Sequence, residues 1–181
     1  FRSTACTNGR DVMYGRAFVE SLTDQELVGL VLHENLHKCY QHAILWKHLW
    51  KENPQLANMA ADYVINLEIK DLEHNHRDFI KLPDKGLVDE QYRGMDTGEV
   101  FRALQEQGGE GGGGDSCEGE GLDEHDFDSL TEGEQESVSK EIEQAIRQGA
   151  LMAGKMGGDE SRVIGELTAP KVDWREQLKI G

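Results

Sequence analysis

The sequence is short of long apolar runs, of cysteine and of basic side chains. No stretch approaches the roughly 18 consecutive apolar residues that a membrane-spanning helix needs, so a membrane span is excluded. The three cysteines, Cys6, Cys39 and Cys117, lie far apart and form no CxxC pair. This pattern fits neither a disulfide framework nor a thiolate zinc site, and it favours a reducing, cytoplasmic compartment.

Basic residues are outnumbered, because 19 Lys and Arg stand against 35 Asp and Glu, giving a net charge of -16 over 181 residues. Negative charge of this size repels nucleic acid phosphates and anionic lipid headgroups. We therefore expect no nucleic acid partner and no membrane partner. The length fits one domain, or one domain with a short appendage.

The acidity is concentrated between Arg102 and Lys140, a stretch with twelve acidic residues and no Lys or Arg. Within it, residues 107–121 include eight glycines among fifteen positions. Such a composition buries too little apolar surface to offset its backbone entropy, so a flexible acidic linker or loop is expected at 107–129. The linker divides the chain into a domain at 1–106 and a C-terminal helical segment at 130–181, which we expect to pack on the same domain.

Local signals predict a helix-rich chain with one hairpin. Asn8 and Gly9 can both take positive φ and stand between extended-type segments, which predicts a β-hairpin within residues 5–14. Thr23 and Glu26 form a capping box, so a helix is expected to begin at residue 24, and no Gly or Pro among residues 38–41 ends it before residue 42.

Further start signals predict the remaining helices. Asn53 followed by Pro54 opens a second helix of about four turns. Capping patterns recur later and predict helices near 97–106 and 132–153, and a last short helix is expected at 173–180. The predicted fold class is therefore α+β, helix-rich with a small β-sheet or hairpin.

The first long helix carries the sequence His33-Glu34-Asn35-Leu36-His37, an HExxH motif. The spacing of four residues places both imidazoles on one helix face, close enough to share one Zn2+ ion, with Glu34 beside it as a general base. The preceding LVGLVL is apolar on all sides and predicts a buried helix, in which unpartnered His and Glu side chains would be costly. Core histidines bonded to neighbouring groups are the alternative interpretation.

A third protein ligand is expected on the second long helix, where Asn58, Asp62 and Asn66 share one face of an otherwise apolar segment. Asp62 is the predicted ligand, and Asn58 and Asn66 are predicted to orient ligated groups. A solvated polar edge on that helix is the alternative.

Two histidines compete with Asp62 for the ligand role. His42 would lie nearly opposite the metal-facing side of an unbroken helix, so it is an alternative ligand only if the helix ends before it. His125, just after the glycine-rich stretch, could reach the site as an additional ligand or lie in an exposed loop. No role is predicted for the remaining histidines, which are His48, His74 and His76.

The chain resembles a bacterial and phage family of predicted metal-dependent peptidases, whose members often precede a von Willebrand factor A-like domain. The matching segments include LVLHENLHKCYQH, NMAADYVIN, LPDKGLVDEQYRGMDTGEVFRAL and APKVDWREQL. Family members tend to carry a small residue before the third His and an Arg after it. Here Gln41 precedes His42 and Lys47 is the nearest base, which weakens His42 as a ligand.

The resemblance implies a zincin-like metallopeptidase domain acting on peptide or protein substrates. In the mechanism expected from the motif, Glu34 takes a proton from a zinc-activated water and passes it to the leaving amine. The hairpin could present an edge strand to an extended peptide. The alternatives are a non-catalytic scaffold or adaptor stabilised by zinc, and a zinc hydrolase acting on a different amide.

Overall fold

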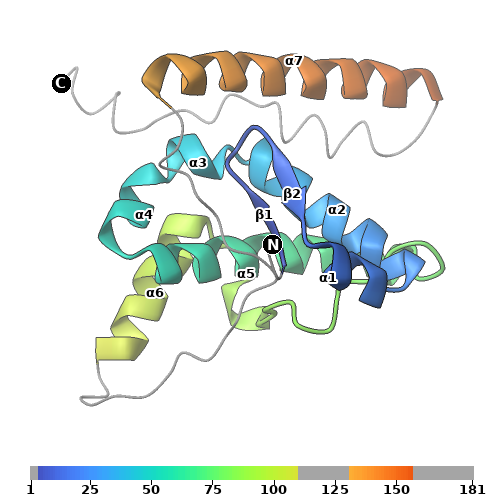
Figure 1. The fold of residues 1–181 in the computed structure, drawn as a ribbon. Helices are drawn as coiled ribbons and strands as arrows, with labels where there is room; N and C mark the ends of the chain where they lie inside the picture. Colours follow the sequence, from blue (N-terminus) through green and yellow to red (C-terminus); the bar gives the residue numbers. More distant parts are fainter. Residues whose placement is uncertain (1–3, 110–130, 157–181) are drawn as a thin grey trace. The chain divides into compact units, whose positions relative to one another are not determined.

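The computed structural model describes residues 4–109 and 131–156 (Figure 1). Its elements in chain order are β1 (Ala5–Thr7), β2 (Val12–Tyr14), α1 (Arg16–Ser21), α2 (Asp24–Cys39), α3 (His42–Leu45), α4 (Lys47–Glu52), α5 (Pro54–Asn75), the 3-10 turn η1 (Glu90–Tyr92), α6 (Thr97–Gly109) and α7 (Glu132–Met156). The predicted helix-rich α+β fold with a small sheet is thereby confirmed. None of the described helices is both long and apolar enough to cross a membrane.

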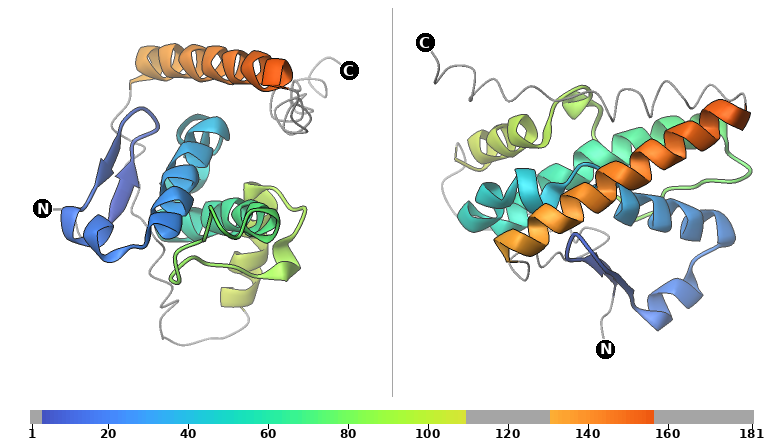
Figure 2. Two further views of the ribbon diagram at one scale, coloured as in Figure 1. Left: turned by 90° about the vertical axis from the view of Figure 1, so that its right-hand side faces the viewer. Right: turned by 90° about the horizontal axis from the view of Figure 1, so that it is seen from above.

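The chain divides into two compact units, residues 1–139 and 140–181. In the first unit, α5 packs against α2, α4 and α6, and β1 lies against α2 (Figure 2). Packing of the whole segment 130–181 on the first domain stays a prediction. The helix expected at 173–180 lies outside the described residues.

β1 and β2 form an antiparallel hairpin in which Ala5 pairs with Tyr14 and Thr7 with Val12. Gly9 takes a left-handed φ of 90°, whereas Asn8 does not have a positive φ as predicted. The side-chain oxygen of Asn8 instead accepts hydrogen bonds from the backbone N–H groups of Arg10 and Asp11, at 2.9 and 2.7 Å. An asparagine that caps the turn in this way has no need of the left-handed conformation.

The start of α2 is confirmed. The backbone N–H of Glu26 donates to the Thr23 hydroxyl at 3.3 Å, and the N–H of Thr23 donates to the Glu26 carboxylate at 2.9 Å. α5 also begins as expected, with Pro54 in its first turn and the Asn53 side chain accepting from the N–H of Leu56.

The predicted end of α2 is wrong. The helix was expected to run through His42, but it stops at Cys39, and Gln41 takes a left-handed conformation with φ of 51°. The Gln41 carbonyl then accepts hydrogen bonds from the N–H groups of Ile44 and Leu45, so a new helix starts beyond the bend. A left-handed glutamine costs about 1–2 kcal/mol, and burial of His42 and Ala43 directly beyond the bend offsets that cost.

The reciprocal cap of Asp96 and Glu99 is present before α6, with backbone-to-carboxylate distances of 2.9 and 2.8 Å. α6 continues to Gly109, so the first three residues of the predicted linker are helical. The rest of that linker, residues 110–129, lies outside the described residues. α7 matches the helix predicted at 132–153 and ends three residues later.

α2 and α5 enclose a small apolar cluster that also includes the segment after α5. Leu36, Ile65, Ile69 and Leu82 form it. The backbone N–H of Lys81 donates to the carbonyl of Gln25 at 3.1 Å, which brings this segment directly onto α2. A larger cluster joins α4, α5 and α6 and contains Trp50, Ala57, Ala60, Ala61 and Phe101.

Gly29 on α2 permits this approach, because a Cβ at that position would lie 2.1 Å from the carbonyl oxygen of Lys81. Gly29→Ala should therefore lower the free energy of unfolding by about 1–3 kcal/mol, since backbone must move and the gain in helix propensity is only about 1 kcal/mol. The measurement is urea unfolding. Gly108→Ala in α6, where an added Cβ meets nothing within 4 Å, is the control and should leave the free energy of unfolding unchanged or raise it by up to about 1 kcal/mol. Equal effects of both substitutions would contradict the close packing.

Glu26 ties the start of α2 to the same segment through a 2.8 Å contact with the Lys81 ammonium group. Hydrogen bonds from Lys81 and then from Thr23 lower the pKa of Glu26 from 4.5 to about 2. The carboxylate therefore stabilises the fold fully above about pH 4.5, and this stabilisation is lost as the pH falls toward 2.

Glu26→Gln should accordingly be less stable than wild type at pH 7, and the difference should shrink below about pH 4.5. Urea midpoints measured between pH 7 and pH 3 test this. Glu20→Gln, at an exposed ion pair with Arg16, is the control, because pairs of this kind contribute little to stability. A difference between Glu26→Gln and wild type that stays constant over the range would rule out the titration of Glu26 as its source.

Candidate metal centre

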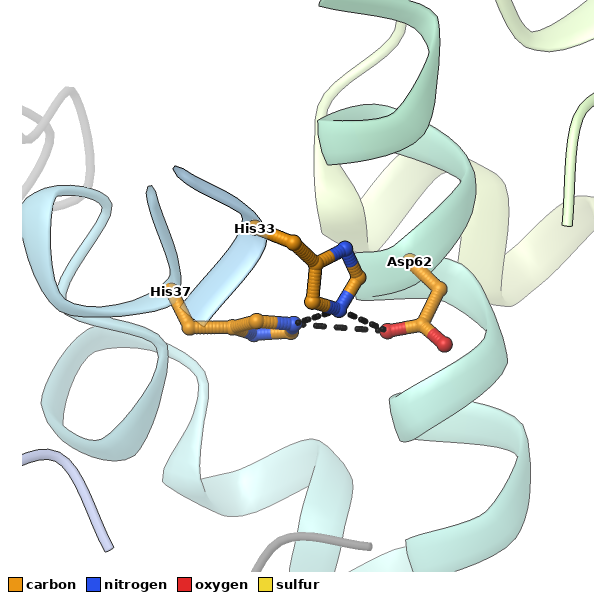
Figure 3. Close-up of side chains that lie close together, drawn as sticks. All are labelled: His33, His37 and Asp62. Carbon is orange, nitrogen blue, oxygen red and sulfur yellow. Dashed lines mark hydrogen bonds and ion pairs between the residues drawn. The ribbon is translucent and has the colours of Figure 1, made fainter. Parts of the chain in front are cut away.

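Three potential ligand side chains meet between α2 and α5 (Figure 3). His33 and His37 project from one face of α2, one turn apart, and Asp62 projects toward them from α5. The Nε2 atoms of the two imidazoles are 3.1 Å apart. Oδ1 of Asp62 lies 3.3 Å from Nε2 of His37 and 3.7 Å from Nε2 of His33.

These separations fit a shared zinc ion. Two imidazole nitrogens and one carboxylate oxygen are a common zinc donor set, and ligands at about 2.0–2.2 Å in a tetrahedron lie about 3.3–3.6 Å from one another. The three atoms lie within 4.8 Å of one another, and their side chains are fully buried. Among the residues that the structure describes, no other cluster of three His, Cys, Asp or Glu side chains has this arrangement.

A hydrogen-bonded connection sets the tautomer of His33. The amide nitrogen of Asn66 donates to the carbonyl of Leu87 at 3.0 Å, so the amide oxygen faces His33. That oxygen can only accept, and therefore Nδ1 of His33, at 2.9 Å, carries the hydrogen. In the neutral ring this leaves the Nε2 lone pair directed at His37 and Asp62.

His42 does not join the three clustered side chains. Because the chain bends at Gln41, its ring returns to α2, and its Nδ1 lies 2.8 Å from Nδ1 of His37, on the side away from Asp62. The expectation that His42 lies opposite the metal-facing side, which assumed an unbroken helix, is wrong for this reason. Its Nε2 lies 3.2 Å from the hydroxyl of Thr97, a residue that sequence analysis did not single out.

Glu34 is fully buried beside the two histidines on α2. Burial, and secondly the charge of Glu34, raise the pKa of Tyr14 at the end of β2. The first strand of the same hairpin, β1, contacts α2, the helix that carries Glu34. Sequence analysis missed Tyr14 as an individual residue, because nothing local to the hairpin relates it to α2.

The remaining sequence candidates are less informative. Asn58 is half-buried on α5, one turn before Asp62, and its orienting role stays a prediction. His125 lies outside the described residues. His48, His74 and His76 are not part of the cluster.

Two imidazoles one helical turn apart and a carboxylate from a second helix match a donor set that metal-dependent hydrolases use. The chain belongs to the family described as "Putative metallopeptidase domain", whose model matches residues 2–180. This confirms the family resemblance, whereas a following von Willebrand factor A-like domain stays a prediction. No curated protein and no solved structure matches the chain.

Asp62→Ala should abolish stoichiometric zinc binding and remove the rise in melting temperature that zinc causes in the wild type, because an ion bound only by the folded state stabilises it. Bound metal is measured by elemental analysis after dialysis. Asp71→Ala on the same helix is the control, since Asp71 is exposed and pairs with Arg93 at 2.8 Å. Full zinc content in the Asp62 variant would exclude Asp62 as a ligand.

Proposed function

We propose that the protein is a zinc-dependent peptidase in which His33, His37 and Asp62 hold the ion and Glu34 is the general base. The observation that carries the proposal is the buried cluster of three ligand atoms beside Glu34, in a chain of a metallopeptidase family. A bound zinc ion would supply Lewis-acid polarisation of the scissile carbonyl and would acidify the attacking water.

The protein side chains have separate tasks in this mechanism. Glu34 takes the proton of the attacking water and passes it to the departing amine, which breaks the peptide bond and yields a carboxylic acid and an amine. Asn66 keeps the hydrogen of His33 on Nδ1, so that Nε2 stays available to the metal. His33 thus serves as a neutral ligand.

The hairpin supports a binding mode for an extended peptide. In the described part of the chain β2 pairs with β1, and it carries the half-exposed side chains of Met13 and Tyr14. β1 contacts α2, the helix that carries Glu34, so a peptide that added to β2 would join a hairpin packed on the proposed catalytic helix. We propose β2 as the strand that a substrate extends.

One observation favours a second function, a non-catalytic scaffold or adaptor stabilised by zinc. His33, Glu34, His37 and Asp62 are each at most 1% exposed. A peptide can reach them only if covering groups move, whereas a structural site needs no access. Glu34 favours catalysis, because a structural site has no use for a base beside its ligands.

Glu34→Gln separates the two functions. Glutamine keeps the size of the side chain but cannot take the proton, so the variant should keep its zinc and its fold while turnover falls at least about 100-fold. Cleavage of an unfolded protein is followed by mass spectrometry, with chelator-treated and zinc-restored wild type as controls. Asn35→Ala, at the exposed neighbouring position on α2, is the matched variant and should cleave normally.

Two outcomes would contradict the peptidase mechanism. A wild type that holds one zinc ion per chain and cleaves nothing would support the scaffold. A Glu34→Gln variant that cleaves as fast as wild type would show that hydrolysis occurs with another base.

A further inference from the structure

A buried row of three polar side chains leads away from the candidate metal centre. It runs from His37 on α2 to His42 at the start of α3 and on to Thr97 at the start of α6. The separations are 2.8 Å between the two Nδ1 atoms and 3.2 Å from Nε2 of His42 to the Thr97 hydroxyl. All three residues are at most 3% exposed, so bulk water does not compete for these hydrogen bonds.

The position of the hydrogens in this row follows from the metal-binding form of His37. A neutral imidazole that offers Nε2 to a metal carries its hydrogen on Nδ1, which then donates to Nδ1 of His42. His42 must in turn carry its hydrogen on Nε2 and donate to the Thr97 oxygen. A hydroxyl can accept this bond, so the row satisfies both rings without any net charge.

Local packing holds Thr97 at the end of this row. The next residue is Gly98, where a Cβ would lie 2.7 Å from Cζ3 of Trp46, so glycine allows the start of α6 to approach the residue that follows α3. The ring of His42 is held as well, because the ring of Tyr40 stacks on it with centroids 5.8 Å apart and an angle of 18° between the planes. His42 is therefore held in orientation as well as in hydrogen bonding.

We propose that His42 and Thr97 are positioning residues that keep His37 in the tautomer whose Nε2 can bind the metal. This inference rests on the proposed zinc site and deepens it. The bend at Gln41 thereby gains a function, because it turns His42 back toward His37. Through His42, Thr97 at the start of α6 affects the metal affinity of His37, although the two lie sixty residues apart in the sequence.

The matched pair Thr97→Val and Thr97→Ser tests the proposal in the full chain. Valine keeps the shape but cannot accept, so His42 would favour a hydrogen on Nδ1, facing His37, and would push the hydrogen of His37 onto Nε2. Competition with a chelator should then show zinc affinity reduced about 10-fold, at the lower end of the usual effect of groups that orient ligands. Serine keeps the hydroxyl and should stay near wild type.

A second readout reports the tautomer directly. In the zinc-loaded wild type, nitrogen NMR of the histidine rings should show His37 with hydrogen on Nδ1 and His42 with hydrogen on Nε2. If the valine variant fails to fold, His42→Asn and His42→Leu test the same hydrogen bond, because the asparagine oxygen can accept from His37 and leucine cannot. The asparagine variant should then bind zinc more tightly than the leucine variant.

The outcomes separate this inference from the proposed function. A wild type that binds no zinc would overturn the metal site itself. A wild type that binds zinc, with valine and serine variants that are equally tight or equally weakened, would overturn the positioning role while leaving the site intact. The reverse hydrogen positions on His37 and His42 in the zinc-loaded protein would also overturn it.

Discussion

The burial of two imidazoles and two carboxylates carried by α2 and α5 is the constraint on which the surrounding structure depends. His33, Glu34, His37 and Asp62 are almost completely removed from solvent. Taking such groups out of water costs several kcal/mol each unless hydrogen bonds, opposite charge or a metal compensate. A metal ion with its water would compensate all four at once, and the distances among the ligand atoms fit that solution.

Two hydrogen-bonded connections extend this constraint to distant parts of the chain. His33 is oriented by Asn66, which is itself held by the carbonyl of Leu87. His37 contacts His42, which reaches the start of α6 at Thr97. Each imidazole of the centre is thus oriented by its own set of groups, and the apolar clusters on α5 keep the helices that carry those groups in place.

The same burial that favours a metal also restricts access to it. Membership of a metallopeptidase family calls for a peptide to reach the ion, and the hairpin combines half-exposed side chains on β2 with a contact of β1 to α2. Access would therefore require movement of groups that cover the site. A zinc-stabilised scaffold would need no such movement. The two functions therefore use the same residues and differ in whether a peptide must reach the ion.

Helix starts could be predicted from the sequence because they depend on residues three positions apart. The capping box of Thr23 and Glu26 and the Asn53-Pro54 start are local, and both are found in the structure. The prediction for His33 and His37 was equally local, since residues four positions apart on a helix lie on the same face. The stripe of Asn58, Asp62 and Asn66 placed its residues on one face of α5, although what that face would meet was a hypothesis.

Helix ends and partners depended on tertiary structure. Nothing in the residues Lys38 to Gln41 signals a stop, and the left-handed Gln41 is tolerated because the bend buries His42 and Ala43. Thr97 could not be predicted as a site residue from the sequence. Its contact with His42 depends on the start of α6 lying beside Trp46, where Gly98 allows a close approach. The sequence by itself determined which side chains could share a metal, through the periodicity of single helices. Only the tertiary structure decided which hydrogen bonds orient them, because those bonds join segments far apart in the chain.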